Sequence, residues 1–252
     1  MTAPALEARG LVRQFGALMA TDNVSLVIER GARQALIGPN GAGKTTLINL
    51  LTGILRPTDG RVFLEGRDVT GLPQHERVRL GLTRTFQINQ LFPHLTPAES
   101  LGLAISERER SGLDFWRVAG TRPGIVAEIE DLLARFGLEA EMDVPTRKLP
   151  YGKQRLLEIA LALATRPRVL LLDEPAAGVP EDERQGILAA LAALPADVAI
   201  LLIEHDMDLV FSFASRISVL VAGRLLVEGE PAAIAGDERV RAVYLGEDAT
   251  HG

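Results

Sequence analysis

The sequence predicts an α/β fold with a parallel sheet whose strands end in residues suited to phosphate chemistry. Residues 34–37, 169–172 and 199–203 are short apolar runs with the length of buried strands. A glycine-rich loop follows the first run, two carboxylates follow the second, and a histidine lies just beyond the third. Because the carboxyl ends of parallel strands lie along one edge of a sheet, we expect these groups to meet there.

The composition is that of a folded protein with an ordinary core. Of 252 residues, 47% are hydrophobic, which suffices for a single domain over residues 1–252. The formal net charge of −6 argues against a nucleic-acid partner, which is bound through clustered positive charge.

The residue types also limit the compartment and the metal chemistry. The chain has no cysteine and four histidines without a ligand spacing, so a reducing cytoplasm is compatible and thiolate metal sites are excluded. The first residues do not resemble a secretory signal, and the longest apolar runs are far shorter than the roughly 18 residues of a membrane helix. Any membrane role is therefore expected to come through partner proteins.

The N-terminal part is expected to form a small antiparallel sheet ahead of the glycine loop. Residues 6–8, 24–28 and 34–37 are strand-like runs with turn residues between them. Phe15 lies close before the loop, and its ring can stack on an adenine. Taken alone, a phenylalanine there more simply belongs to the core or to a turn.

The glycine loop fits the pattern G-x-x-x-x-G-K-[ST] and lies between a strand and a helix, as a phosphate cradle requires. Glycines let the backbone approach the phosphates, and the N–H groups of the helix N-terminus bind their charge. We expect Lys44 to reach the β- and γ-phosphates and Thr45 to offer its hydroxyl to Mg²⁺. The nucleotide-binding residues predicted here are Gly38, Pro39, Asn40, Gly41, Ala42, Gly43, Lys44, Thr45 and Thr46.

The middle of the chain is expected to hold an inserted helical subdomain over residues 98–150. Residues 61–66 and 82–87 before it have strand character, and the second run ends at Gln87, which taken alone is simply polar surface. Within the insert, apolar residues recur at helical spacing from Ile125 to Phe136. This stripe packs on the core or on a partner, and the core is the commoner use.

Residues 149–155 come directly before a strong helix former, residues 156–164. The proline and glycine in this segment are typical of a helix N-terminus. Its N–H groups form either a second anion site or a plain helix cap.

Asp173 and Glu174 follow their strand directly, and His205 follows the next one. One carboxylate can hold Mg²⁺ through a water molecule, and its neighbour can polarise an attacking water. His205 is a candidate γ-phosphate sensor at the same edge. Two acids after a strand can also begin an ordinary loop, but the phosphate loop in the same chain favours the catalytic interpretation.

Residues 216–252 are expected to form a C-terminal hairpin, with strands at 217–221 and 224–227, and a short helix ending near Leu245.

In this order and spacing the motifs resemble the ATP-binding subunit of ABC transporters over essentially the whole chain. The Walker A loop is residues 38–46, Walker B is residues 170–173 with Glu174 behind it, and residues 149–155 stand at the place of the signature motif. Single residues match three further motifs, which are the adenine-stacking aromatic, the Q-loop and the switch histidine: Phe15, Gln87 and His205.

The resemblance implies a P-loop NTPase of the ABC ATPase type, with a small antiparallel β-subdomain and an inserted α-helical subdomain, that uses ATP and Mg²⁺. It places Lys44, Gln87, Glu174 and His205 in the catalytic set. Thr45, Gln87 and Asp173 are the implied metal site. The implied signature contacts to nucleotide are Tyr151, Gly152, Lys153 and Gln154.

The resemblance also implies a head-to-tail dimer with two ATP molecules, each between the Walker motifs of one subunit and the signature helix of the other. ATP closes this dimer and hydrolysis opens it. Transmembrane permease subunits would feel the closure through a groove near Gln87 and Phe92 and through the helical insert, with this chain peripheral on the cytoplasmic face of the membrane.

Several segments are similar to the branched-chain amino acid importer group, in which two different ATPases often serve one transporter and an extracytoplasmic protein binds the solute. These segments are Thr85–Gln87, Tyr151–Gly152, Asp173–Gly178, Ile203–Met207 and Tyr244–Glu247. The choice between a homodimer and a heterodimer stays open, as does the solute.

Two prolines depart from the family pattern. Pro150 stands where a serine is usual, so that a hydroxyl for the partner's γ-phosphate is missing, and Pro180 stands where an Asn or Asp is common. Neither change removes a catalytic group, and we expect hydrolysis to be retained, at a slower rate and with more dependence on a partner.

ATPases with other functions can have the same nucleotide site. A soluble DNA-repair or translation ATPase would need two fused nucleotide domains or a long coiled coil, for which 252 residues leave no room. A nucleotide-gated module without turnover is disfavoured by Glu174 and His205. The ATPase of a lipid exporter is the nearest alternative.

Overall fold

The computed structural model describes residues 3–85, 91–109 and 123–248. It divides into two compact units: unit 1 comprises residues 1–82, 168–174 and 196–252, and unit 2 comprises residues 83–167 and 175–195. Unit 2 contains the whole range 98–150 of the predicted insert, and it also contains residues 83–97, 151–167 and 175–195. Gln87 lies outside the described residues.

Unit 1 contains an antiparallel sheet of order β2-β1-β4-β5. Its strands are β1 (Leu6–Phe15), β2 (Leu18–Ile28), β4 (Asp59–Leu64) and β5 (Arg67–Asp68). β1 and β2 form a hairpin in which Leu6 pairs with Ile28 and Phe15 with Leu18. The antiparallel β-subdomain predicted from the sequence is therefore present.

A second sheet in unit 1 has the order β10-β9-β3-β8-β7. Its strands are β3 (Arg33–Ile37), β7 (Val169–Asp173), β8 (Ala199–Ile203), β9 (Arg216–Val221) and β10 (Arg224–Gly229). β3 pairs in parallel with β8 and β9, and β7 pairs in parallel with β8. β10 closes the predicted C-terminal hairpin by pairing antiparallel with β9.

The prediction that residues 34–37 belong to the antiparallel sheet is wrong. They lie in β3, between the parallel strands β8 and β9, and four of the five residues of β3 are buried. Burial on both faces explains the continuous apolar run, which is typical of a central parallel strand. The place in the antiparallel sheet is taken by β4 and β5, which follow the first helix.

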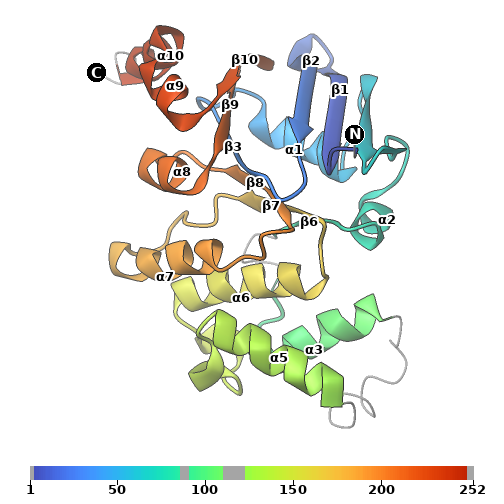
Figure 1. Ribbon diagram of the computed structural model, residues 1–252, viewed down its shortest axis with the longest axis vertical. Helices are drawn as coiled ribbons and strands as arrows, with labels where there is room; N and C mark the ends of the chain where they lie inside the picture. Colours follow the sequence, from blue (N-terminus) through green and yellow to red (C-terminus); the bar gives the residue numbers. More distant parts are fainter. Residues whose placement is uncertain (1–2, 86–90, 110–122, 249–252) are drawn as a thin grey trace. The chain divides into compact units, whose positions relative to one another are not determined.

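The helices of unit 1 begin with α1 (Lys44–Thr52), which starts at the glycine loop. The others are α2 (Gln74–Arg79), α8 (Met207–Phe213), α9 (Pro231–Gly236) and α10 (Glu238–Asp248). α1 packs against β1 and β2 (Figure 1), and its Leu47, Ile48, Leu50 and Leu51 are fully buried in the core of this unit. Burying four such side chains contributes on the order of 6–12 kcal/mol before the entropy cost of ordering the chain.

Arg77 on α2 holds the far end of α1. Its guanidinium donates to the carbonyl oxygens of Leu50 at 2.8 Å and Leu51 at 2.6 Å, and to those of Leu72 at 3.0 Å and Thr70 at 2.9 Å. Burial lowers the pKa of Arg77 to about 10, so the side chain stays charged at neutral pH. A cation among the last carbonyls of a helix satisfies groups without an intrahelical partner and complements the helix dipole.

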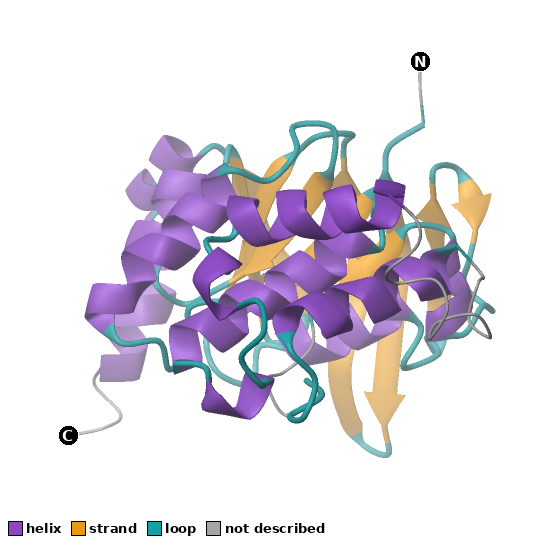
Figure 2. Ribbon diagram, turned by 90° about the horizontal axis from the view of Figure 1, so that it is seen from below, coloured by secondary structure: helices purple, strands orange, loops and turns teal. Residues whose placement is uncertain are grey.

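Unit 2 begins at residue 83, within the short strand β6 (Leu82–Arg84), and is mainly helical. Its helices are α3 (Pro97–Arg108), α5 (Pro123–Arg135), α6 (Tyr151–Ala164) and α7 (Glu181–Ala192), with 3₁₀ turns at Glu139–Glu141 and Thr146–Lys148. α3 packs on α5 and α6, and α6 packs on α7 (Figure 1; Figure 2 draws all helices in purple). The predicted stripe of α5 is buried at Ile125, Ile129, Leu132 and Leu133.

An ion-pair network ties the helices of unit 2 together. Arg108 on α3 pairs with Glu128 on α5 at 2.6 Å and donates to the carbonyl oxygen of Ala164 at the end of α6. Arg166 reaches the same Glu128 at 2.9 Å. The two guanidinium groups lower the pKa of Glu128, Arg108 having the larger effect, so the carboxylate is charged at neutral pH.

Candidate functional site

The glycine loop is a backbone structure shaped for close approach. Gly43, the N-cap residue of α1, has φ 100°, and a Cβ atom there would lie 2.3 Å from the carbonyl oxygen of Ala20 on β2. A side chain is therefore excluded for steric as well as conformational reasons. The loop is also held from the C-terminal hairpin, because the Gly223 N–H donates to the Ala42 carbonyl at 2.8 Å.

Lys44 and the start of α1 provide positive charge at this loop. Lys44 Nζ donates to the carbonyl oxygens of Gly38 and, at 3.0 Å, Pro39, so the ammonium lies across the loop. Among the described residues, no side chain caps α1 and no acidic residue stands in its first turn. The N–H groups of this helix N-terminus are thus available to an anion, as the sequence pattern predicts. Thr45 is the second residue of α1.

Glu174 stands at the carboxyl end of β7 in a left-handed backbone conformation, with φ 47°. Its N–H donates to the Ile203 carbonyl at 2.9 Å, which ties it to the end of β8. The Glu174 side chain is 46% exposed, so its carboxylate reaches water. Asp173, the last residue of β7, pairs in register with Ile203.

His205 lies beside Glu174, as the strand-end argument predicts. The distance between His205 Nδ1 and Glu174 Oε1 is 3.7 Å, close enough for an ion pair when the imidazole is protonated. Asp206 caps the following helix α8 by accepting the N–H groups of Asp208 at 3.1 Å and Leu209 at 3.2 Å. His205 is therefore fixed on a tight strand-to-helix connection.

Glu204 is a residue of this site that the sequence analysis did not single out. Its side chain is 1% exposed, lies 3.8 Å from His205 Nδ1 and accepts the His205 N–H at 3.1 Å. The buried carboxylate of Glu204 and the exposed carboxylate of Glu174 thus both lie near the same ring nitrogen, His205 Nδ1. The signal available in the sequence was a glutamate directly after the apolar run 199–203.

Phe15, at the end of β1, is 42% exposed. The guanidinium carbon of Arg13 lies 4.6 Å from the centroid of its ring, and Arg13 Nη1 donates to the Arg56 carbonyl at 2.9 Å. One face of the ring is therefore covered by a positioned cation. The exposure of the ring fits a stacking surface better than a core residue.

The predicted signature residues all lie at the start of α6 in unit 2. The Tyr151 hydroxyl donates to the Ala177 carbonyl at 3.2 Å, and Gln154 Nε2 donates to the Leu149 carbonyl at 2.9 Å. Lys153 lies 3.3 Å from Glu141. The N–H of Gly152 donates to Glu183 on α7 at 2.7 Å.

Further along α6, Glu158 is buried and pairs with Arg155 at 2.9 Å. Burial raises the pKa of Glu158 to about 7, although the Arg155 guanidinium acts in the opposite direction.

Metal coordination by protein side chains alone is not supported in the described part of the chain, where no three His, Asp or Glu side chains gather as a metal-binding group. The donors that are present fit a different arrangement. Mg²⁺ in nucleotide sites is held by one or two protein oxygens together with phosphate oxygens and water. A threonine that follows the phosphate loop and a carboxylate at the end of another strand of the same sheet, Thr45 and Asp173, are donors of this kind.

Comparison with protein families gives two matches. The family described as "ABC transporter" matches residues 21–177, which is more than half of the chain. A second family, described as "Branched-chain amino acid ATP-binding cassette transporter", matches residues 224–250.

Curated relatives are similar over nearly their whole length. The chain is 39% identical to the high-affinity branched-chain amino acid transport ATP-binding protein BraF of Pseudomonas aeruginosa, over 98% of this chain and 100% of the relative. It is 40% identical, with the same coverage, to the protein LivG of Escherichia coli, which carries the same description. A probable LivG of Archaeoglobus fulgidus is 35% identical over 96% of this chain and 95% of the relative.

Solved structures agree with the fold. The ADP conformation of an ATP-binding cassette of an ABC transporter has a TM-score of 0.84 and 31% identity, covering 97% of this chain and 100% of its own. A nucleotide-free ATP-binding cassette from an ABC transporter has a TM-score of 0.83 and 30% identity, covering 97% and 99%. The predicted fold class is confirmed.

Proposed function

We propose that this chain, which belongs to the ABC transporter family, is the ATP-hydrolysing subunit of a transporter that takes up branched-chain amino acids or a related small solute. The relatives that match it over 98% of its length are named as branched-chain amino acid transport ATP-binding proteins. The family match at residues 224–250 supports the same group through an independent part of the chain.

The observation that carries the proposal is the arrangement of three strand ends in unit 1. β3 leads into the phosphate loop with Lys44, and β8, which carries His205 behind it, lies between β3 and β7. Glu174 follows β7, and its carboxylate is 3.7 Å from the His205 ring. A cationic phosphate cradle and a water-accessible carboxylate are thereby built on one sheet edge.

Each of these residues has a role in hydrolysis that follows from its chemistry. Lys44 and the N–H groups of the loop hold and stabilise the phosphoryl group that is transferred. Glu174 takes the proton of the attacking water as general base, and His205 orients it and senses the γ-phosphate. Glu204 holds the imidazole in place from its buried side.

Thr45 and Asp173 would hold Mg²⁺, with Gln87 as a further ligand at the Q-loop position. When bound, the ion neutralises phosphate charge and orients the phosphate oxygens. Asp173 supplies a negative charge at the end of a buried strand, and Thr45 supplies a hydroxyl at the first turn of α1.

The signature residues Tyr151, Gly152, Lys153 and Gln154 are proposed to contact the nucleotide of a second ATPase subunit, while Phe15 stacks on the adenine of the chain's own nucleotide. Support for Phe15 comes from its 42% exposure beside the loop-supporting strand β2. Support for the signature segment comes from its place at the N-terminus of α6, where the N-cap residue Pro150 has no side chain that could cap the helix.

The proposed partners are transmembrane permease subunits, a second ATPase subunit of the same or a related chain, and indirectly an extracytoplasmic solute-binding protein. No helix in the described residues is long and apolar enough to cross a membrane. The similarity to transport ATP-binding proteins supports a location on the cytoplasmic face of the membrane, attached through the permeases.

The substitution Glu174→Gln tests the hydrolytic assignment. It keeps the shape of the side chain and removes the base, so the ATPase rate should fall about 100-fold or more while ATP still binds. The matched control is Glu76→Gln, the same chemical change at an exposed residue of α2, which should leave the rate unchanged. ATP turnover of Glu174→Gln at the wild-type rate would rule the assignment out.

A further inference from the structure

We propose that the Glu183 carboxylate takes the place of a phosphate group in the resting subunit, where it accepts the hydrogen bond of the Gly152 N–H. It has to leave before the ATP of the second subunit can bind there. The inference rests on the proposed function, in which the start of α6 receives the nucleotide of the second subunit. It adds a regulatory contact to that site.

The contact provides a hydrogen-bond acceptor that α6 itself lacks at its N-terminus. The N-cap residue is Pro150, which has no side-chain acceptor, and the first turn contains no acidic residue. The first N–H groups of a helix need partners from outside it and attract negative charge. Glu183, from the first turn of α7, supplies the missing acceptor, since its Oε2 accepts the Gly152 N–H at 2.7 Å.

The two helices are shaped for this contact. A Cβ atom added to Gly152 would lie 2.1 Å from Glu183 Oε2 and 3.1 Å from Glu183 Cβ. Glycine is therefore required for the carboxylate to come so close. A phosphate oxygen has the same chemistry as this carboxylate oxygen, and the single N–H of Gly152 can donate one strong bond at a time. The carboxylate and a phosphate thus compete for one donor.

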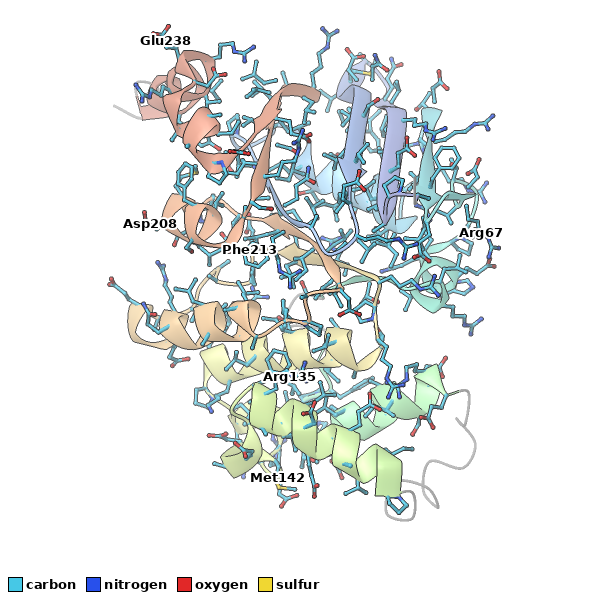
Figure 3. The ribbon with its side chains drawn as sticks, in the orientation of Figure 1. Arg67, Arg135, Met142, Asp208, Phe213 and Glu238 are labelled. Carbon is cyan, nitrogen blue, oxygen red and sulfur yellow. The ribbon has the colours of Figure 1, made fainter. Side chains whose placement is uncertain are left out.

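A cavity beside Glu183 has room for the carboxylate after it leaves Gly152. Glu183 lines a cavity of about 740 Å³ in unit 2, between the end of α5, the start of α6 and α7. The walls on the α7 side are small, with Gly186 and Ala189, and two cationic side chains, Lys153 and Arg135, line the same space (Figure 3 labels Arg135 on α5). These cations have partners, because Lys153 lies 3.3 Å from Glu141 and Arg135 lies 3.0 Å from Asp131. A displaced Glu183 carboxylate would lie near these two ion pairs, Lys153–Glu141 and Arg135–Asp131.

The direction of the effect follows from the competition. Glu183 stabilises the resting subunit and therefore raises the ATP concentration that is needed to close the dimer. Removing its carboxylate removes a helix cap from the resting state but leaves the ATP-bound state intact. From the usual contribution of such caps, we expect the ATP requirement to fall about three- to tenfold.

The test measures ATP-driven dimerisation of the full chain by light scattering, in the hydrolysis-blocked Glu174→Gln background and with its co-purified second ATPase where one is present. Glu183→Ala should lower the ATP concentration at half-maximal dimer about three- to tenfold. Glu183→Gln should lower it less, because the amide oxygen still accepts the Gly152 N–H without a charge. The control Glu181→Ala removes an exposed acid from the same turn of α7 and should change nothing.

Hydrogen exchange of the Gly152 amide in the ATP-free chain checks the contact itself. Exchange should be slow in the parent and in Glu181→Ala, and faster in Glu183→Ala. An unchanged or raised ATP requirement in Glu183→Ala, or equal Gly152 protection in all variants, overturns the inference while the proposed function stands. A parent that binds ATP but never dimerises defeats the proposed function, and the inference with it.

Discussion

At the scale of single residues, the site depends on a glutamate held in a conformation that mainly glycine adopts. Glu174 has φ 47°, and its backbone is fixed by the hydrogen bond to Ile203, so its carboxylate is directed beside His205 at 3.7 Å. Such a conformation costs about 1–2 kcal/mol for a residue with a Cβ atom. Strain of this kind persists where the surrounding structure enforces it, and it is found at functional sites.

The sequence predicted Asp173, Glu174 and His205 because they lie at or just after the end of an apolar strand, and it predicted Lys44 because this residue completes the glycine-loop pattern. What the sequence did not predict are contacts that these and other residues make with distant positions. Glu183 and Gly152 are 31 positions apart and meet only because α6 packs on α7. Arg13 and Phe15 did offer a local signal, since residues two apart on a strand lie on the same face.

The contact between Arg13 and the Phe15 ring can be tested by substitution. We expect Arg13→Gln to weaken ATP binding about two- to fivefold, because the guanidinium holds the Phe15 ring as a stacking platform. Binding of inorganic tripolyphosphate, which has no base, should not change. Both affinities can be measured by calorimetry on the full chain.

The chain offers a matched control for Arg13. Arg9 lies 4.3 Å from the centroid of Phe63, in the same kind of contact and in the same sheet. Arg9→Gln should leave ATP binding unchanged. If Arg13→Gln weakened ATP and tripolyphosphate binding equally, the side chain would act on the phosphates or on folding, and its role at the base would be refuted.

At the scale of elements, α1 is held at both ends. Its N-terminus is the phosphate loop, and its C-terminal carbonyls are bound by Arg77 from α2. The sequence predicted the loop and the helix because glycine, lysine and threonine follow a recognisable pattern. It did not predict α2, which lies in a polar stretch without apolar periodicity, or the buried arginine on it.

We expect Arg77→Met to lower the free energy of unfolding by about 3 kcal/mol or more, since it leaves four buried or half-buried carbonyl oxygens without their donor. Arg77→Lys should cost less, because an ammonium can satisfy some of these oxygens. Urea denaturation of the full chain measures both.

Arg79→Met is the control, at an exposed position of the same helix, and it should change stability by less than about 0.5 kcal/mol. A similarly small effect of Arg77→Met would show that solvent satisfies the carbonyls and that Arg77 does not hold α1.

At the scale of the whole molecule, the chain carries two helix N-termini, one in each compact unit, that we propose to bind phosphate groups. Unit 1 has the phosphate loop with Glu174 and His205, and unit 2 has the start of α6 with Glu183. The α/β class and the order of motifs could be predicted from the sequence. The sequence left the place of residues 34–37 open between the two sheets, because a short apolar run fits either sheet until its neighbours are known.

The central claim, that this chain powers a solute importer, is tested most directly by purifying it from gently solubilised native membranes and identifying what accompanies it. The account predicts two multi-spanning permease subunits, a second short ATPase and an extracytoplasmic solute-binding protein, whose ligand would name the solute. Recovery of soluble partners alone, under conditions in which a control transporter stays assembled, would contradict the transport function and leave only the ATPase chemistry.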